Sequence, residues 1–456
     1  MSGAGGQLIA RSVRQALAVR PEAMAPEVMG KARLCLTDAM RCQFEARGLT
    51  TSRQALAVIS PCPGGAPIVA TDRLATPGEA AFAMATMAAG LLREDMHAAS
   101  ISHHGIVVWP TLLALSAGTK VSGARLLAAG VVGYEFGARL GAALFDADLA
   151  RRLRPTAFSA TSGAAMAGAY LLDLSEAEAI AAVALAVDAS AGLNQWPRTG
   201  GDEIFFQAGR AARAAVTAVA LARAGAFASP SMLDGAAGLF VAAGRTAPDD
   251  LNLFEGEPAI MAVYNKALPI CNFAQTASQA ALAVAAEPGF DPTAVRALIV
   301  AVTEAAQAYP GCDHLGGYER PLQAQMSIRF GVAAALAHGD LKRARFDLLD
   351  DPQTQRLADL CVLRSDPALT AAFPKLQGAR VEATMADGRV LAAALENVVA
   401  ASPDQIRAGF LADAGEALGP ERASALLLMI DRLEDGADAS ALLAAAHLKP
   451  PRSAAA

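Results

Sequence analysis

The stretch VSGARLLAAGVVGYEFGARLGAALF, residues 121–145, indicates most clearly which fold this chain adopts. Its apolar residues recur at i, i+3, i+4 and i+7, the spacing of one face of an α-helix. Alanine is abundant in it, favours helix at every position and lets neighbouring helices approach closely. The pattern returns in EAAFAMATMAAGLLRE and in LSEAEAIAAVALAVDAS, where Ser175 and Glu178 have the spacing of a capping box. Strand signals are nearly absent up to about residue 260, so this part is predicted to be all-helical.

The pattern changes after Gly256. The segment VRALIVAVTEAA (295–306) has a β-branched apolar core typical of a strand. Two alternating runs flank Asp387-Gly388 in ARVEATMADGRVLAAALENV (379–398), which is a strong hairpin signal. Between them, PLQAQMSIRFGVAAALAHGDL favours a helix that ends at Gly339. From about residue 403 to 446 the pattern is helical again.

The predicted fold class is therefore mostly α, in two domains. A large all-helical domain covers residues 1–263, with residues 400–456 returning to it, and a smaller α+β domain covers residues 264–399. The tail KPPRSAAA is expected to fray.

Composition limits the possible functions. The 456 residues are 54% hydrophobic and 18% charged, which is typical of a folded globular protein. The net charge is −6 and no basic block occurs, so nucleic acid is not expected as a partner. The six cysteines form no CxxC pair and fit a reducing cytoplasm. Neither the N-terminus nor the charge-free PTAFSATSGAAMAGAYLL has the apolar density of a signal peptide or a membrane span. We expect a cytoplasmic protein that does not bind membranes.

Three of the six histidines fall in EDMHAASISHHGIVVWPTLLAL, residues 94–115. His97 and His103 lie six positions apart, and no HExxH or DxD spacing accompanies them, so no metal site is predicted. The cluster lies on a loop expected between two helices, where catalytic residues concentrate. His104 directly follows His103, so the two rings should point differently. For each histidine taken singly, an ordinary hydrogen-bonded structural role is an equal alternative.

Three further residues have the chemistry to bind or activate a substrate. Lys266 lies at the predicted domain boundary, and clefts between domains are favoured ligand sites; a solvated linker lysine is the alternative. Arg154 precedes a Pro-Thr helix start, which is a natural carboxylate receptor, although it could be a plain surface arginine. Tyr309 precedes a glycine-rich loop, where its phenol can exchange a proton or simply pack.

The order of several segments resembles the MmgE/PrpD family, which includes 2-methylcitrate dehydratases, cis-aconitate decarboxylases and iminodisuccinate epimerases. The resemblance extends over nearly the whole chain. The segments that carry it are GGAPIVATDRLATPGEAAFAMATMAAGLLREDMHAA, HHGIVVWPTLLALSAG, LLAAGVVGYEFGARLGAAL with Gly133, Tyr134 and Glu135, RPTAFSATSGAAMAGAYLLDL, KALPICNFAQTASQA, VEATMADGRVL and LGPERASALLLMIDRLED.

The resemblance implies a large helical domain and a smaller α+β domain with the active site between them. It also implies a cytoplasmic homodimer that needs no metal or organic cofactor. His103 matches the family's loop histidine, Lys266 its cleft lysine, Asp95 and His97 its Asp-His turn, and Tyr309 its active-site tyrosine. We therefore predict these five as catalytic residues, and Arg154, Lys266 and His104 as substrate-binding residues.

The chain departs from the family pattern at several polar positions. Leu92 and Glu94 stand where aspartates are usual, and Met96 stands where threonine is usual. Near the cleft, Arg154, Gln207 and Gln275 replace histidines, and Ile204 replaces a lysine or arginine. Several donors are thus lost, while one residue that could be a neutral base has become a permanent cation. These changes bear on 2-methylcitrate dehydration more than on carboxylate binding.

The family reactions share a carbanion formed next to a carboxylate, which preorganised cations and donors must stabilise. Lys266 and Arg154 suit that role, and His103 is the expected base, with Asp95 orienting an imidazole. The leading hypothesis is a lyase, a dehydratase, acting on a small di- or tricarboxylate in carboxylic acid metabolism, with Tyr309 or His97 as the acid. The alternatives are an epimerase of the iminodisuccinate type or a decarboxylase on a succinate-like acid, and a non-catalytic carboxylate-binding member.

Overall fold

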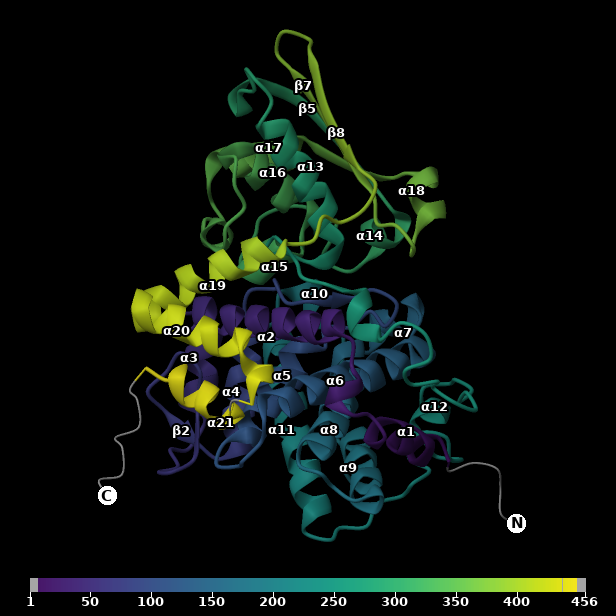
Figure 1. The fold of residues 1–456 in the computed structure, drawn as a ribbon. Helices are drawn as coiled ribbons and strands as arrows, with labels where there is room; N and C mark the ends of the chain where they lie inside the picture. The colour runs from purple at the N-terminus through teal and green to yellow at the C-terminus, as the bar shows by residue number, and fades with distance from the viewer. Residues whose placement is uncertain (1–6, 437, 449–456) are drawn as a thin grey trace.

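The computed structural model describes residues 7–436 and 438–448, which form a broad helical body and a smaller α+β body stacked on it (Figure 1). This confirms the predicted fold class. The tail 449–456, expected to fray, lies outside the described residues, as do residues 1–6 and 437.

The helical body is built mainly from the first half of the chain. Its α-helices are α1 (Leu8–Leu17), α2 (Pro26–Ala46), α3 (Thr50–Ala57), α4 (Pro77–Ala89), α5 (Gly105–Ser116), α6 (Gly123–Leu144), α7 (Ala147–Arg152), α8 (Pro155–Leu171), α9 (Glu176–Asp188), α10 (Trp196–Thr199), α11 (Glu203–Arg223) and α12 (Leu239–Ala242). Two-residue strands interrupt them: β1 (Ala66–Pro67) pairs with β2 (Leu74–Ala75), and β3 (Met96–His97) pairs with β4 (Val263–Tyr264). The capping box predicted for Ser175 and Glu178 is present at the start of α9.

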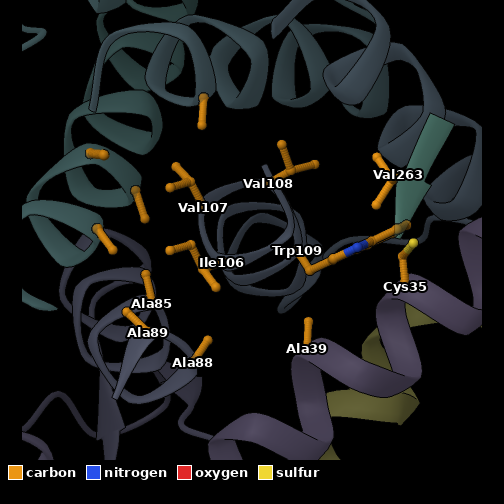
Figure 2. Close-up of a cluster of buried hydrophobic side chains, with 14 of the residues drawn as sticks. Cys35, Ala39, Ala85, Ala88, Ala89, Ile106, Val107, Val108, Trp109 and Val263 are labelled. Carbon is orange, nitrogen blue, oxygen red and sulfur yellow. The ribbon is translucent and has the colours of Figure 1, made fainter. Parts of the chain in front are cut away.

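The centre of this body is α5, which is buried along its whole length. Figure 2 shows its side chains pointing outward in different directions, with Ile106 toward the alanines of α4 and Trp109 toward α2 and Val263. Beside it, α6 and α8 approach so closely that a Cβ on Gly163 would lie 2.5 Å from the Gly133 carbonyl oxygen. Small residues thus allow close helix packing, as the alanine content predicts.

The smaller body contains a four-stranded sheet in the order β6-β5-β7-β8. Its strands are β5 (Val295–Val302), β6 (Cys361–Ser365), β7 (Ala379–Met385) and β8 (Val390–Leu395), and its helices are α13 (Gln275–Ala285), α14 (Glu304–Ala308), α15 (Pro321–Met326), α16 (Ile328–His338), α17 (Pro352–Leu360) and α18 (Pro367–Ala372). The β7–β8 hairpin confirms the Asp387-Gly388 prediction, with Gly388 at φ +84° and Thr384 opposite Val390. The predicted strand in 295–306 is confirmed as β5.

One helix prediction was wrong in detail. The segment predicted as a helix ending at Gly339 is two helices, α15 and α16, separated at Ser327. The Ser327 hydroxyl accepts the amide N–H of Phe330 and so caps α16, which competes with continuation of the helix. The expected end is present, because Gly339 adopts φ +67° after His338.

The C-terminal helices α19 (Pro403–Leu418), α20 (Pro420–Asp431) and α21 (Ala439–Ala445) return to the helical body, where α19 packs on α2 (Figure 1). The two chain segments that cross between the bodies lie side by side, because the Ala401 N–H donates to the Asn265 carbonyl at 2.9 Å. On this packing we propose domain boundaries at residues 263/264 and 399/400. Among the described residues, no helix is both long and apolar enough to cross a bilayer.

Candidate active site

A short strand pair brings two distant parts of the chain together. Met96 pairs with Tyr264 and His97 with Val263 in the antiparallel β3–β4 pair. Lys266 is the second residue after β4, and its side chain lies against residues 92–94 at the entry to β3. Asn265 fixes this crossing, because its amide donates to Asp38 Oδ2 at 2.8 Å.

Lys266, Glu94 and His103 form a buried cluster at this point. The Lys266 ammonium donates to the Leu92 carbonyl and lies 3.4 Å from Glu94 Oε1, with only 1% of the Lys266 side chain exposed. The same Glu94 oxygen lies 3.7 Å from His103 Nε2. Leu92 has φ +53°, a left-handed backbone conformation that is uncommon for a residue other than glycine and that accompanies the turn of its carbonyl toward the lysine.

The tautomer of His103 follows from its partner. Its Nδ1 lies 2.6 Å from the Asp95 carbonyl oxygen, so Nδ1 carries the proton and Nε2 presents a lone pair. Burial, with Lys266 and Arg154 nearby, lowers the pKa of His103 well below its usual value. The ring is therefore neutral near pH 7, in the form that a base requires.

Asp95 contacts this histidine through its backbone rather than its carboxylate. Its carboxylate accepts the Gly105 N–H at 3.1 Å, at the start of α5, and the Tyr134 hydroxyl. Burial raises the pKa of Asp95 to about 6. The predicted orienting role thus has a geometric basis in the Asp95 carbonyl.

His97 and His104 belong to a second buried cluster. Ser100 Oγ lies 2.9 Å from His97 Nδ1 and 3.1 Å from His104 Nε2. His104 packs on Tyr134, with 5.8 Å between ring centroids, and its Nδ1 has no hydrogen-bond partner among the described residues. Burial, and to a smaller extent Arg139, lowers the pKa of His97 to about 4. Adjacent histidines therefore serve different clusters, as predicted from their sequence positions.

A third group of polar residues lies around Arg154 at the start of α8. The Arg154 guanidinium lies over the Trp196 ring, 5.2 Å from its centroid. Its positive charge helps to lower the pKa of His103, after burial and Lys266, and opposes the rise that burial causes in the pKa of Tyr309. The Tyr309 oxygen accepts Asn194 Nδ2 at 3.0 Å, so the phenol proton is free to donate elsewhere. Within the described part of the chain, Asn194 Oδ1 and Trp196 Nε1 are buried without hydrogen-bond partners.

Two hollows adjoin these groups. A pocket of about 310 Å³ opens beside Tyr309 and is lined by Arg198, Gln307, Tyr309, Gly311, Asp313, His314 and Leu315. A cavity of about 10 Å³, roughly one water molecule, is lined by Cys35, Asp38, Ala39, Cys42, Glu94, Asp95, Gly105 and Ile106. The Lys266 cluster itself is enclosed, so the open pocket lies on the Tyr309 side.

The residues that depart from the family pattern have structural partners. Gln275 holds the loop after Lys266 through bonds from its amide to the carbonyls of Leu268 (2.8 Å) and Ile270 (2.9 Å). Gln207 donates to the Leu193 carbonyl at 2.9 Å and so supports the loop that carries Asn194. Ile204 is buried on α11, and Met96 lies in β3.

Sequence reasoning missed Glu94 and Asn194 as members of the site. The sequence marks Glu94 as a departure from the family turn, and its position directly before Asp95 in a histidine-rich loop is the signal that points to the site. Asn194 lies in a loop between helices and had no pattern that singled it out.

Comparison with known proteins gives matches to the same family in both bodies. The MmgE/PrpD N-terminal domain model matches residues 13–251, and the MmgE/PrpD C-terminal domain model matches residues 268–434. The chain is also similar to "Cis-aconitate decarboxylase-like protein oryM" of Aspergillus oryzae (strain ATCC 42149 / RIB 40). The two are 27% identical over 468 residues, which cover 93% of this chain and 94% of the relative.

Proposed function

The chain belongs to the MmgE/PrpD family, whose members are generally enzymes such as dehydratases and decarboxylases, and from this we propose that it is a cofactor-independent lyase. Its substrate is a small di- or tricarboxylate, and its reaction is a dehydration that begins with removal of the proton next to a carboxylate. The single observation that carries the proposal is the neutral His103, whose Nε2 lone pair faces the buried Lys266–Glu94 pair.

The proposed reaction uses charges already present in the site. His103 Nε2 takes the α-proton, and the electron pair of the broken C–H bond forms an enediolate. Lys266 and Arg154 stabilise the negative charge on the substrate oxygens, because fixed cations in an enclosed site need little reorganisation. Tyr309 has a free phenol proton and is the proposed donor to the departing hydroxyl, which leaves as water. Asp95 orients His103 through its carbonyl.

His97 and His104 have a supporting part in this proposal. Both rings hydrogen-bond Ser100 within the loop that carries His103, so they are proposed to hold the conformation of that loop rather than to touch the substrate.

A decarboxylase is the second candidate, favoured by the name of the 27% identical relative. Loss of carbon dioxide also leaves an electron pair on carbon, so Lys266 and Arg154 would stabilise the negative charge that this carbanion places on the remaining substrate oxygens. In that case the enzyme returns a proton to carbon, and no hydroxyl departs.

The test is proton NMR of the purified protein in D2O with a panel of hydroxylated succinates and citrates and with cis-aconitate. A vinyl signal that grows as a hydroxy acid disappears is the expected result. Deuterium at the α-carbon without an alkene would indicate an epimerase instead, and loss of a carboxyl carbon would indicate the decarboxylase. The variants His103→Ala and Lys266→Ala should abolish turnover, whereas equal rates in both variants and the natural chain would overturn the assigned roles.

A cytoplasmic homodimer completes the proposal, on the resemblance to the family. Light scattering coupled to gel filtration would give a mass near twice the monomer mass of 46.5 kDa if this is correct.

A further inference from the structure

We propose that Glu94 is a catalytic carboxylate that takes up the substrate proton through His103 and thereby releases the charge of Lys266 to the intermediate. This inference rests on the proposed function, because it assigns the fate of the proton that His103 removes. It concerns a residue that replaces an aspartate of the family turn.

The first argument is burial without full pairing. Glu94 is 3% exposed, and its Oε1 faces Lys266 and His103 at 3.4 and 3.7 Å. Its Oε2 is buried and has no hydrogen-bond partner among the described residues. Burying a carboxylate oxygen without a donor costs free energy, so such a group beside a base and a cation points to a role in which it gains a proton or a partner.

The second argument is the relation between Glu94 and His103. The histidine Nδ1 is already committed to the Asp95 carbonyl, so a proton taken from substrate must arrive at Nε2. Nε2 then becomes a donor that faces Glu94 Oε1. The positive charges of Lys266 and Arg154 oppose an imidazolium here, as does burial. The proton is therefore driven onward from nitrogen to the carboxylate.

The third argument is charge balance. Before the reaction, Lys266 and Glu94 neutralise each other. As the α-C–H bond breaks, its proton passes to His103 Nε2 and its electron pair becomes the enediolate. When the proton moves on to Glu94 Oε1, the imidazole is neutral again and the carboxylate is lost as a partner for Lys266. The ammonium charge is then free for the enediolate, so the enclosed site carries the same net charge throughout.

In the second half of the reaction the proton travels back. The C–O bond breaks as the electron pair of the enediolate forms the C=C bond, and the hydroxyl leaves as water with a proton from Tyr309. The proton held on Glu94 then returns through His103 to the Tyr309 phenolate, which restores the starting state of all three groups. No further oxidant, reductant or co-reactant is needed for this exchange.

The test uses 3-nitropropionate that has been ionised beforehand to its nitronate dianion, which imitates an enediolate, and measures proton uptake on binding by calorimetry in two buffers of different ionisation enthalpy. The natural chain should take up about one proton per site, and Glu94→Gln should bind the dianion with almost none. The control is Glu45→Gln, because Glu45 pairs with Arg93 in the same region without facing His103. This control should behave like the natural chain.

The second measurement is α-proton exchange with D2O for a substrate identified by the panel above. Glu94→Gln should slow it by about 10²- to 10⁴-fold, Glu94→Asp should recover part of the rate, and Glu45→Gln should leave it unchanged. Thermal unfolding of each variant separates misfolding from a catalytic loss.

The outcomes separate the two proposals. If the natural chain binds the nitronate without taking up a proton, or if Glu94→Gln keeps the uptake, the role of Glu94 is refuted while the lyase proposal stands. If the natural chain neither binds the nitronate nor exchanges the α-proton of any acid in the panel, the lyase proposal is refuted and the role of Glu94 with it.

Discussion

Replacing Lys266 with methionine should reveal how strongly the buried ion pair depends on both partners. The side chains of Lys266 and Glu94 are 1% and 2% exposed, so Lys266→Met leaves a carboxylate without its cation in a region closed to bulk solvent. Breaking such a pair typically costs about 3–5 kcal/mol. The double variant Lys266→Met/Glu94→Gln removes both charges and should recover most of this loss, which gives a coupling energy of about 3 kcal/mol.

The surface pair Arg152–Asp148 provides the comparison. Its nitrogen and oxygen are closer, at 2.7 Å, but the side chains are 64% and 70% exposed. Its coupling energy should therefore be about 0.3–0.5 kcal/mol. Both cycles can be measured by urea unfolding followed by tryptophan fluorescence. Equal coupling energies for the two pairs, or a double variant no more stable than Lys266→Met, would refute the reasoning from burial.

Three further perturbations test other parts of the structure. Burial lowers the pKa of His97 from 6.5 to about 4, so its contribution to stability is present above pH 6.5 and lost as the pH falls toward 4. His97→Gln should therefore remove about 2–3 kcal/mol of the difference in unfolding free energy between pH 7 and pH 4.5. The prediction is contradicted if urea unfolding shows the same dependence of stability on pH in this variant and in the natural chain. Gln275→Ala leaves backbone groups of the loop after β4 unpaired and should lower the free energy of unfolding by about 3 kcal/mol. A measured loss smaller than the contribution of a single hydrogen bond would contradict this prediction. Gly163→Ala forces a Cβ against the Gly133 carbonyl and should destabilise the chain by about 1–3 kcal/mol, whereas Gly48→Ala, with open space around it, should have little effect in the same thermal unfolding assay.

Local patterns were sufficient to predict most of the fold. The helices follow the 3.6-residue spacing, and the Asp387-Gly388 turn predicts its hairpin, because both signals arise from neighbouring residues. The break at Ser327 could not be predicted in the same way. The Ser327 hydroxyl caps α16 and also hydrogen-bonds the Tyr318 hydroxyl, which lies outside the helical segment, whereas the helical spacing of the sequence continues through Ser327.

The candidate site was predictable residue by residue but not as an arrangement. The histidine cluster and Lys266 stand out in the sequence, yet their meeting depends on the β3–β4 pair, which joins segments more than a hundred residues apart with only two residues in each strand. A strand of two residues is too short to show the alternation of polar and apolar side chains by which strands are recognised in a sequence. The position of Glu94 between Lys266 and His103 depends in turn on the left-handed backbone of Leu92. A leucine in the sequence does not predict this conformation, because it is uncommon for residues other than glycine.

The neighbouring chain crossings at Asn265 and Ala401 have a mechanical consequence. Because the two chain segments that join the bodies lie side by side, we expect any rotation of the smaller body to turn about them, so that its distant parts move most and the crossings least. Lys266 lies at the crossings, tied to the helical body by β4, whereas Tyr309 travels with the smaller body. Opening would part Tyr309 from Asn194 and Arg320 from Asp202, admitting a ligand, while the acid–base cluster stayed assembled.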